Sequence, residues 1–221
     1  MGKEIREIMS HDPKIRRILN NDILYHMGVG SKVGSNFNVG RNVMIGKGVK
    51  IGKNVFINDF SIVENNVIIE DDVEIDHFVI IKESSFIGEG SYVGDYTKIP
   101  EHSIVGKNVR IGSFIRLGKR CIVGDNCVLK SKCIIGPDAI VGDNTTIGPY
   151  AILLHETHEK ESISSEIGKN CYLGTGAIIG PGKIVCDNVV IGGNSFVSKN
   201  IEEPGVYVGN PTRKLEKIIN Q

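Results

Sequence analysis

The sequence predicts an all-β fold, in which short strands coil around one elongated core. The first observation is a hydrophobic period: an aliphatic residue stands at every sixth position from Met27 to Leu153, a span of 126 residues or 21 steps of six without a slip. A helix with 3.6 residues per turn cannot keep such a stripe on one face, whereas short strands joined by a turn every six residues can. The second observation is glycine, which supplies 27 of the 221 residues, well above its usual share.

Each six-residue repeat offers two inward-facing residues. Two positions before each aliphatic residue stands a small or β-branched one, as with Val67 before Ile69, and residues two apart in a strand point to the same side. The same period returns in a new phase from Ile167 to Val197. The 22 repeats of the first series and the 6 of the second make 28. At three repeats to a triangular coil of about 18 residues, they predict a parallel β-helix of about nine coils, stacked about 4.8 Å apart.

Both ends of the chain depart from this pattern. Residues 3–9 and 13–20 carry apolar positions at helical spacing, and Asp12-Pro13 is typical of a helix start. We expect residues 1–26 to form a helical cap over the open edge of the stack. The β-helix is then predicted to occupy residues 27–200. Residues 201–221 form a basic tail, in which Asn210-Pro211 is expected to start a short helix.

Composition argues against several functional classes. Lys and Arg number 26 against 26 Asp and Glu, so no basic field predicts nucleic-acid binding. No apolar stretch approaches the ~18 residues of a membrane span, and the first residues lack the apolar segment of a secretory signal. We therefore expect a cytoplasmic protein that does not insert into a membrane.

The five cysteines predict neither disulfides nor a zinc site. Their number is odd and no C-x-x-C pair occurs. Four take the small inward position of a repeat, where a thiol acts as a compact hydrophobe: Cys121, Cys127, Cys133 and Cys171. Cys186 falls at a corner and has no predicted role.

One interruption of the repeat marks a candidate catalytic loop. Leu153 and Ile167 are 14 residues apart, two more than two repeats, so we expect residues 154–166 to leave the coil. The loop holds His155 and His158, and loops on a rigid repeat scaffold are common places for functional groups. An imidazole with a reference pKa near 6.5 can act as a general base. A metal site and a solvated loop without a function are the alternatives.

The histidine loop is followed by the segments IGKNCYLGTGAIIGPG, IGGNSFVSKNI and VGNPTRKL. With these segments the chain resembles the hexapeptide-repeat acyltransferases, and in particular the sugar O-acetyltransferases, over about residues 27–217. The resemblance implies a left-handed parallel β-helix, a homotrimer, and acetyl-CoA as acyl donor in a cleft between neighbouring coils. It also implies that a loop histidine deprotonates the acceptor. The segment AILLH points to His155, with His158 as the second candidate.

The same resemblance supplies the expected coenzyme-binding residues. A G-x-G-A turn would approach the pantetheine and thioester, and its amides could stabilise the oxyanion. The turn consists of Gly174, Thr175, Gly176 and Ala177. Ser195, Ser198 and Lys199 match the family's G-S-V-V-T-K segment, and Arg213, with Lys214 and Lys217 beside it, is expected to bind the phosphates of CoA. No metal is expected, because the gamma-class carbonic anhydrases use H-x-x-x-x-H and a third histidine, whereas this loop has H-x-x-H.

The predicted reaction is direct transfer in a ternary complex. A covalent acyl-enzyme would need an exposed thiol beside a base, and Cys171 is expected to face inward. The hydroxyl of a surface-polysaccharide sugar is the first predicted acceptor, and the amino group of a nucleotide-linked sugar is the second. A non-catalytic or metal-binding trimer remains the alternative of a different class.

Overall fold

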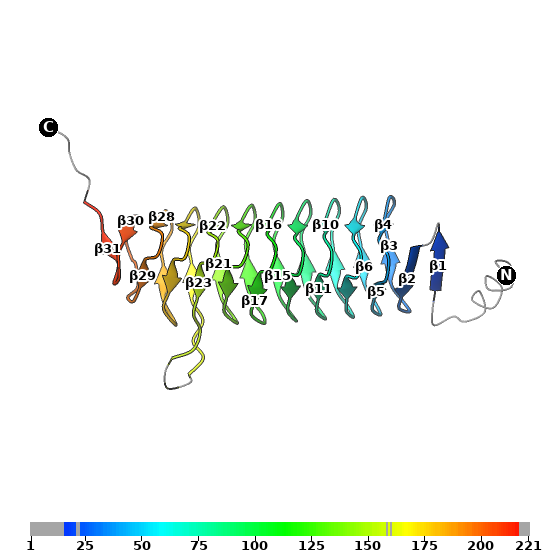
Figure 1. Ribbon diagram of the computed structural model, residues 1–221, viewed down its shortest axis with the longest axis horizontal. Helices are drawn as coiled ribbons and strands as arrows, with labels where there is room; N and C mark the ends of the chain where they lie inside the picture. Colours follow the sequence, from blue (N-terminus) through cyan, green and yellow to red (C-terminus); the bar gives the residue numbers. More distant parts are fainter. Residues whose placement is uncertain (1–15, 21–22, 158, 160, 217–221) are drawn as a thin grey trace.

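The protein is a straight solenoid of short strands (Figure 1). The structure, a computed structural model, describes residues 16–20, 23–157, 159 and 161–216. These residues form 31 strands, most of them two residues long, and contain no helix. Accordingly, no described helix is long and apolar enough to cross a membrane. The all-β prediction is confirmed.

The strands belong in rotation to three sheets, which form the three sides of the solenoid. The first sheet contains β1 (Arg16–Asn20), β2 (Ile23–Met27), β5 (Val43–Ile45), β8 (Ile62–Val63), β11 (Ile80–Ile81), β14 (Lys98–Ile99), β17 (Arg116–Leu117), β20 (Ile134–Ile135), β23 (Ile152–Leu153), β26 (Ile178–Ile179) and β29 (Phe196–Val197). The second contains β3 (Lys32–Val33), β6 (Lys50–Ile51), β9 (Ile68–Ile69), β12 (Phe86–Ile87), β15 (Ile104–Val105), β18 (Ile122–Val123), β21 (Ile140–Val141), β24 (Glu166–Ile167) and β27 (Ile184–Val185). The third contains β4 (Asn38–Val39), β7 (Phe56–Ile57), β10 (Glu74–Ile75), β13 (Tyr92–Val93), β16 (Arg110–Ile111), β19 (Val128–Leu129), β22 (Thr146–Ile147), β25 (Tyr172–Leu173), β28 (Val189–Ile191), β30 (Gly205–Val208) and β31 (Arg213–Lys214).

The strands stack in parallel with a register of 18 residues, as three repeats per coil require. Ile80 pairs with Lys98, and Ile81 with Ile99. The first sheet has eleven strands, and ten remain when the antiparallel β1 is left out. Strands β2 to β29 number 28, one for each predicted repeat, so the described solenoid has between nine and ten coils, in agreement with the repeat count.

The core consists of the two inward residues of each repeat. Val67 and Ile69 are buried, while Ile68 between them is 37% exposed on the outside. The four cysteines predicted to fill the core are buried, and Cys186 at its corner is half-buried. Burial raises the pKa of the thiols of Cys121 and Cys127 to about 11. These thiols are core side chains and poor nucleophiles.

Three edges join the sheets, and their corners have a common backbone. We call the edge between the first and second sheets the first edge, that between the second and third the second edge, and that between the third and first the third edge. The left-handed φ falls on the last residue of each corner, such as Asn108, and not on the glycine that follows the aliphatic residue. That glycine is explained by contact between coils, because a Cβ on Gly88 would lie 2.5 Å from the carbonyl carbon of Gly106.

The predicted terminal helices are the part of the fold prediction that fails. Residues 16–20 of the predicted 13–20 helix form strand β1, which pairs antiparallel with β2. The segment 3–9 lies outside the described residues. At the other end, Arg213 and Lys214 form β31, antiparallel to β30. In both places a returning segment of chain pairs antiparallel with the last strand of a sheet. This pairing gives hydrogen-bond partners to edge amides and carbonyls that a covering helix would leave unpaired.

Candidate active site

The interruption of the repeat forms a loop that projects from the first edge (Figure 1). The chain leaves the coil after β23 and returns at β24, so the predicted loop has the expected place. Its stem is a short antiparallel ladder: the amide of Ile163 donates to the carbonyl of His155 at 2.7 Å, and Glu156 forms a β-bridge with Ser162. His155 therefore lies at the base of the loop, where the backbone is tied to the solenoid.

The His155 side chain rests on a glycine of the preceding coil. A Cβ built on Gly136 would lie 2.8 Å from the Cβ and 3.2 Å from the Cγ of His155. The side chain is half-buried, and within the described residues its ring nitrogens have no hydrogen-bond partner. Both nitrogens are thus open to a substrate. His158 lies outside the described residues.

A buried serine also holds the base of the loop, and sequence reasoning missed it. The Ser165 hydroxyl lies 3.2 Å from the carbonyl of Leu154 and 3.0 Å from that of Gly180. On the same edge, a Cβ on Gly182 would lie 2.5 Å from the Cγ2 of Ile163. The signal for Ser165 was present, because it stands two residues before Ile167, at the small inward position of its repeat.

The glycine turn predicted to bind the coenzyme lies on the third edge, at the other end of the first sheet. The amide of Gly174 donates to Ile191, that of Gly176 to Pro149 and that of Ala177 to Gly174. The Ala177 side chain is buried in the core. Among the four residues, Thr175 alone keeps an amide without a protein acceptor among the described residues, and it is exposed.

A single chain does not bring this turn to His155. Gly176 ends the corner on the third edge and Gly180 begins the next corner, on the first edge, and four extended residues at about 3.3 Å each separate the two glycines by roughly 13 Å. The intervening surface of the first sheet carries Ile152 and Ile178, both half-buried. The two halves of the predicted site therefore flank an apolar face.

Ser198 and Lys199 lie on the same edge as His155. They occupy the corner two coils further on, about 10 Å away at the usual coil spacing. Both line an open groove of about 640 Å³ at the carboxyl-terminal end of the solenoid, together with Lys183 and Tyr207. Ser195, by contrast, points inward: it is buried, and its hydroxyl accepts a hydrogen bond from the amide of Gly209.

The basic ending returns to the glycine turn. Strand β31 pairs Arg213 with Val208, and the amide of Thr212 donates to Phe196 at the start of β29. Arg213 therefore lies by the third edge, on the carboxyl-terminal side of the glycine turn, and is exposed. Lys214 forms an ion pair with Glu203 at 2.8 Å, which raises its pKa. Lys217 lies outside the described residues.

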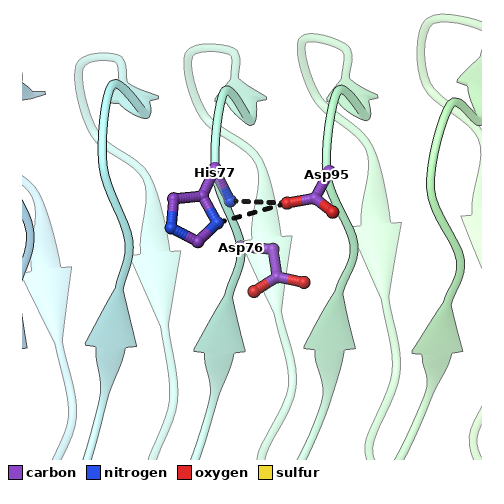
Figure 2. A group of neighbouring side chains, drawn as sticks. All are labelled: Asp76, His77 and Asp95. Carbon is purple, nitrogen blue, oxygen red and sulfur yellow. Dashed lines mark hydrogen bonds and ion pairs between the residues drawn. The ribbon is translucent and has the colours of Figure 1, made fainter.

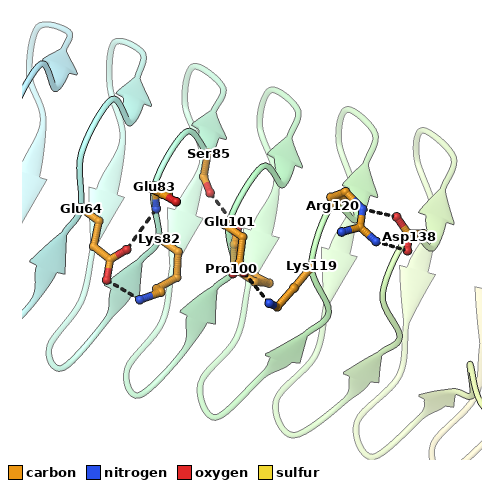
Figure 3. Close-up of polar contacts among 9 residues, drawn as sticks. All are labelled: Glu64, Lys82, Glu83, Ser85, Pro100, Glu101, Lys119, Arg120 and Asp138. Atoms are coloured by element: carbon orange, nitrogen blue, oxygen red, sulfur yellow. Dashed lines mark hydrogen bonds and ion pairs between the residues drawn. The ribbon is translucent and has the colours of Figure 1, made fainter. Parts of the chain in front are cut away.

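On the amino-terminal side of His155, the first edge carries ion pairs between successive coils (Figure 3). Lys82 pairs with Glu64, Lys119 with Glu101, and Arg120 makes two hydrogen bonds to Asp138. The guanidinium of Arg120 lowers the pKa of Asp138. Because this carboxylate is turned toward the preceding coil, it does not orient the imidazole of His155.

A second group of polar side chains lies on the third edge, away from the loop. Asp76, His77 and Asp95 have ligand atoms within 4.8 Å of one another, the one such group among the described residues. Figure 2 shows that the ring and amide nitrogens of His77 both face one carboxylate oxygen of Asp95, at 3.3 and 3.1 Å. Asp76 accepts the Tyr92 hydroxyl at 2.5 Å, which raises the pKa of Tyr92 to about 12.

Protein-family models match most of the solenoid. The model described as the GMPPB C-terminal domain matches residues 22–115 and 57–134. The model of the bacterial transferase hexapeptide (six repeats) matches residues 120–155, and that of the hexapeptide repeat of succinyl-transferase matches residues 166–199. The chain belongs to the hexapeptide-repeat family. The acyltransferase resemblance read from the sequence is thereby confirmed at the level of the family. No curated protein matches the sequence significantly.

Solved structures share the fold at low sequence identity. A UDP-N-acetylglucosamine acyltransferase is 16% identical with a TM-score of 0.52, covering 89% of this chain and 72% of that one. PerB from Caulobacter crescentus, in complex with CoA and GDP-perosamine, is 17% identical with a TM-score of 0.48, covering 62% of this chain and 54% of that one. The acetyltransferase domain of PglB from Neisseria gonorrhoeae, in complex with acetyl coenzyme A, is 21% identical with a TM-score of 0.38, covering 65% and 58%.

These likenesses concern the fold. The hexapeptide-repeat chain spans about half the length of PerB, at 54%. It has the left-handed β-helix fold of the hexapeptide-repeat acyltransferases.

Proposed function

We propose that this hexapeptide-repeat protein is an acyl-CoA-dependent acyltransferase that transfers an acetyl group to a sugar hydroxyl, with His155 as general base. The observation that carries the proposal is the single break in the repeat, which presents one imidazole at a fixed point of the scaffold. The carbonyl of His155 accepts a hydrogen bond from the amide of Ile163 at 2.7 Å, and its side chain packs against Gly136. Its ring nitrogens have no hydrogen-bond partner among the described residues. A positioned imidazole with open nitrogens is suited to take a proton from an acceptor near neutral pH.

In this mechanism the chain's own groups bind the donor and move one proton. His155 removes the acceptor proton, the acceptor oxygen attacks the acyl carbonyl, and the CoA thiolate leaves with the electrons of the broken C–S bond. Thr175 is exposed, and its amide is the one in the glycine turn without an acceptor among the described residues, so it can donate a hydrogen bond to the oxyanion. Arg213 and Lys199, both exposed, are proposed to bind the phosphates of CoA. No metal is proposed.

The proposal includes a homotrimer in the cytoplasm. The histidine loop and the glycine turn lie on different edges of one chain, so a second copy has to supply one of them. A ring of three brings one edge of each copy beside the next copy. Five cysteines without a disulfide among the described residues fit a reducing compartment.

Release of CoA thiol, measured with a panel of sugar acceptors, tests the activity. We expect acetyl-CoA turnover with the wild type, and a loss of 10²-fold or more with His155→Ala while acetyl-CoA binding is retained. His102→Ala is the matched control, since His102 is an exposed histidine on the same edge three coils away. Full activity of His155→Ala would refute the assignment of the base.

The acceptor panel separates the two candidate acceptor groups. Polymeric and free sugars represent the hydroxyl acceptors, and amino-sugar nucleotides represent the amine acceptors. UDP-N-acetylglucosamine, whose nitrogen already carries an acetyl group, joins the hydroxyl acceptors because a solved structure with this fold is named for it. Turnover with amino-sugar nucleotides alone would replace O-acylation by N-acylation. If no acceptor gives thiol release and the protein does not bind acetyl-CoA, a scaffold without catalytic activity would be favoured.

A further inference from the structure

An aromatic ridge runs along the third edge, outside the candidate site. It consists of Phe60, Phe78, Tyr96 and Phe114, one from each of four successive coils. Neighbouring rings stack with centroids 5.1, 4.8 and 4.9 Å apart and interplanar angles of 4°, 4° and 11°. The side chains are 41–54% exposed, so the chain itself leaves about half of each ring in solvent.

The backbone conformation does not account for these residues, although stacking between coils stabilises them. Each occupies the left-handed corner position, with φ between 55° and 61°. That conformation is costly for bulky side chains and is tolerated best by Gly, Asn and Asp. The corresponding corners of the second edge obey this preference throughout: they hold Asn36, Asn54, Asp72, Gly90, Asn108, Asn126, Asn144, Asn170 and Asn188. A conformation kept against its local preference, on an exposed surface, points to a function at that surface.

We propose that the aromatic ridge is the contact by which one copy of this chain seats on the first sheet of the next, closing a ring of three. The inference deepens the proposed function and rests on it, because it names the surface that would bring the glycine turn of one copy to His155 of another. The ridge and the glycine turn lie on the same edge, so a ridge seated on the first sheet carries the turn toward Ile152 and Ile178.

The first sheet has the matching chemistry at the same height. In the four coils that carry the ridge, the outer face of the first sheet displays Ile62, Ile80, Lys98 and Arg116. The two isoleucines fit opposite the two phenylalanines of the first half of the ridge. Lys98 and Arg116 are exposed and have no ion pair within the described residues. They fit opposite the rings of Tyr96 and Phe114 and the adjacent carboxylate of Asp95, as cation–π and charge partners.

Size and symmetry agree with this occupant. A Phe or Tyr buries about 150–250 Å², so four rings that are about half exposed offer roughly 400 Å². With a facing stripe of similar size, the four coils of the ridge alone contribute roughly 800 Å² to a contact whose standard size is about 1,600 Å². In a prism with three sides, an edge and its adjacent face point about 60° apart, which is the angle that closes a ring of three. The second sheet is opposite the ridge, and seating there would give an open row of copies.

The oligomeric state of the full chain, measured without any acyl donor by native mass spectrometry and light scattering, tests the inference. We expect a trimer for the wild type and monomers for Phe78→Asn/Tyr96→Asn, with an unchanged circular dichroism spectrum because Asn suits the left-handed corner. Lys98→Glu/Arg116→Glu, which alters exposed side chains only, is expected to dissociate as well. Ile104→Asn, which removes a 44% exposed residue from the second sheet, is the control and is expected to remain trimeric.

Mixing the two dissociated variants tests whether the ridge meets the first sheet. One variant keeps its first sheet and the other keeps its ridge, so a one-to-one complex is expected to form through the single intact interface. A monomeric wild type, a trimer that survives both double variants, dissociation by Ile104→Asn, or no complex on mixing would each overturn the inference. Thiol release by His155→Ala in a normal trimer would refute the proposed base and leave the ridge contact standing.

Discussion

Gly136→Ala tests whether the fixed position of His155 matters for catalysis. The added Cβ would lie 2.8 Å from the Cβ of His155, and ordinary contact begins near 3.4 Å, so the two have to separate by 0.6 Å. The carbonyl of Leu153 at 3.1 Å limits the movement of the new methyl group, and the hydrogen bond from Ile163 restrains the backbone of His155. The Cα and Cβ of His155 therefore have to shift against this restraint, and the imidazole moves with them.

The size of the effect follows from this displacement. A misplacement of about 1 Å in an active site can cost about 10²-fold in rate. A shift of 0.6 Å is expected to cost about tenfold or more in kcat, which is roughly 1.4 kcal/mol in the barrier. The KM for acetyl-CoA is expected to change little, because the glycine turn and Arg213 are on another edge and Lys199 lies three coils away from Gly136.

Steady-state thiol release by Gly136→Ala and a matched variant gives the measurement. Gly142→Ala is the match: it is a corner glycine on the second edge, where an added Cβ would lie 2.7 Å from the backbone of Gly168. It should lose comparable stability in urea unfolding and keep its kcat. Equal kcat values for wild type and Gly136→Ala would refute the reasoning, as would a loss of kcat shared by both variants.

Three further measurements concern the core and the third edge. At pH 8 a disulfide reagent is expected to modify Cys186 first and the buried thiols such as Cys127 only on unfolding, because burial raises the pKa of Cys127 to about 11. Phenolate absorbance is expected to give a Tyr92 pKa of about 12, falling toward 10 in Asp76→Asn. The stability that the hydrogen bond from Tyr92 to Asp76 contributes is present below the unfolded pKa near 10 and is lost as pH rises toward 12. Ile87→Ala, at 0% exposure, is expected to lower the free energy of unfolding by about 2–5 kcal/mol in urea titration.

The interior of this fold could be predicted from the sequence because it obeys one local rule. A residue such as Ile69 repeats every six positions with Val67 two before it, and both are buried as the strand period requires. The loop at 154–166 was predictable for the same reason, as the one failure of the rule. The rule says nothing about the ends, where apolar residues at helical spacing lie in the strand Arg16–Asn20. There the pairing of an open sheet edge outweighs the helical pattern.

The sequence supplied candidate residues for the site but not their distribution over the surface. A repeat of six fixes which residues share a coil, but the separation of His155 from Gly176 depends on which edge each occupies, and that follows only from counting strands through the three sheets. Ser165 was overlooked because a small inward residue in this pattern is ordinarily core filler, and its hydroxyl differs only in the two carbonyls it faces.

The three edges show where such a chain has room to encode function. The inward positions have to satisfy packing between coils, so they hold little beyond Ile, Val, Leu, Ala, Cys, Ser and Thr. The corner residues and the outward residues of the strands are free to differ, and at the corners the left-handed φ sets Asn and Gly as the unconstrained choice, as on the second edge. Departures from that choice are then informative. Phe78 and Tyr96 on the third edge depart from it and form the ridge of the proposed assembly, while the second edge, with its asparagines, is the one that the assembly leaves in solvent.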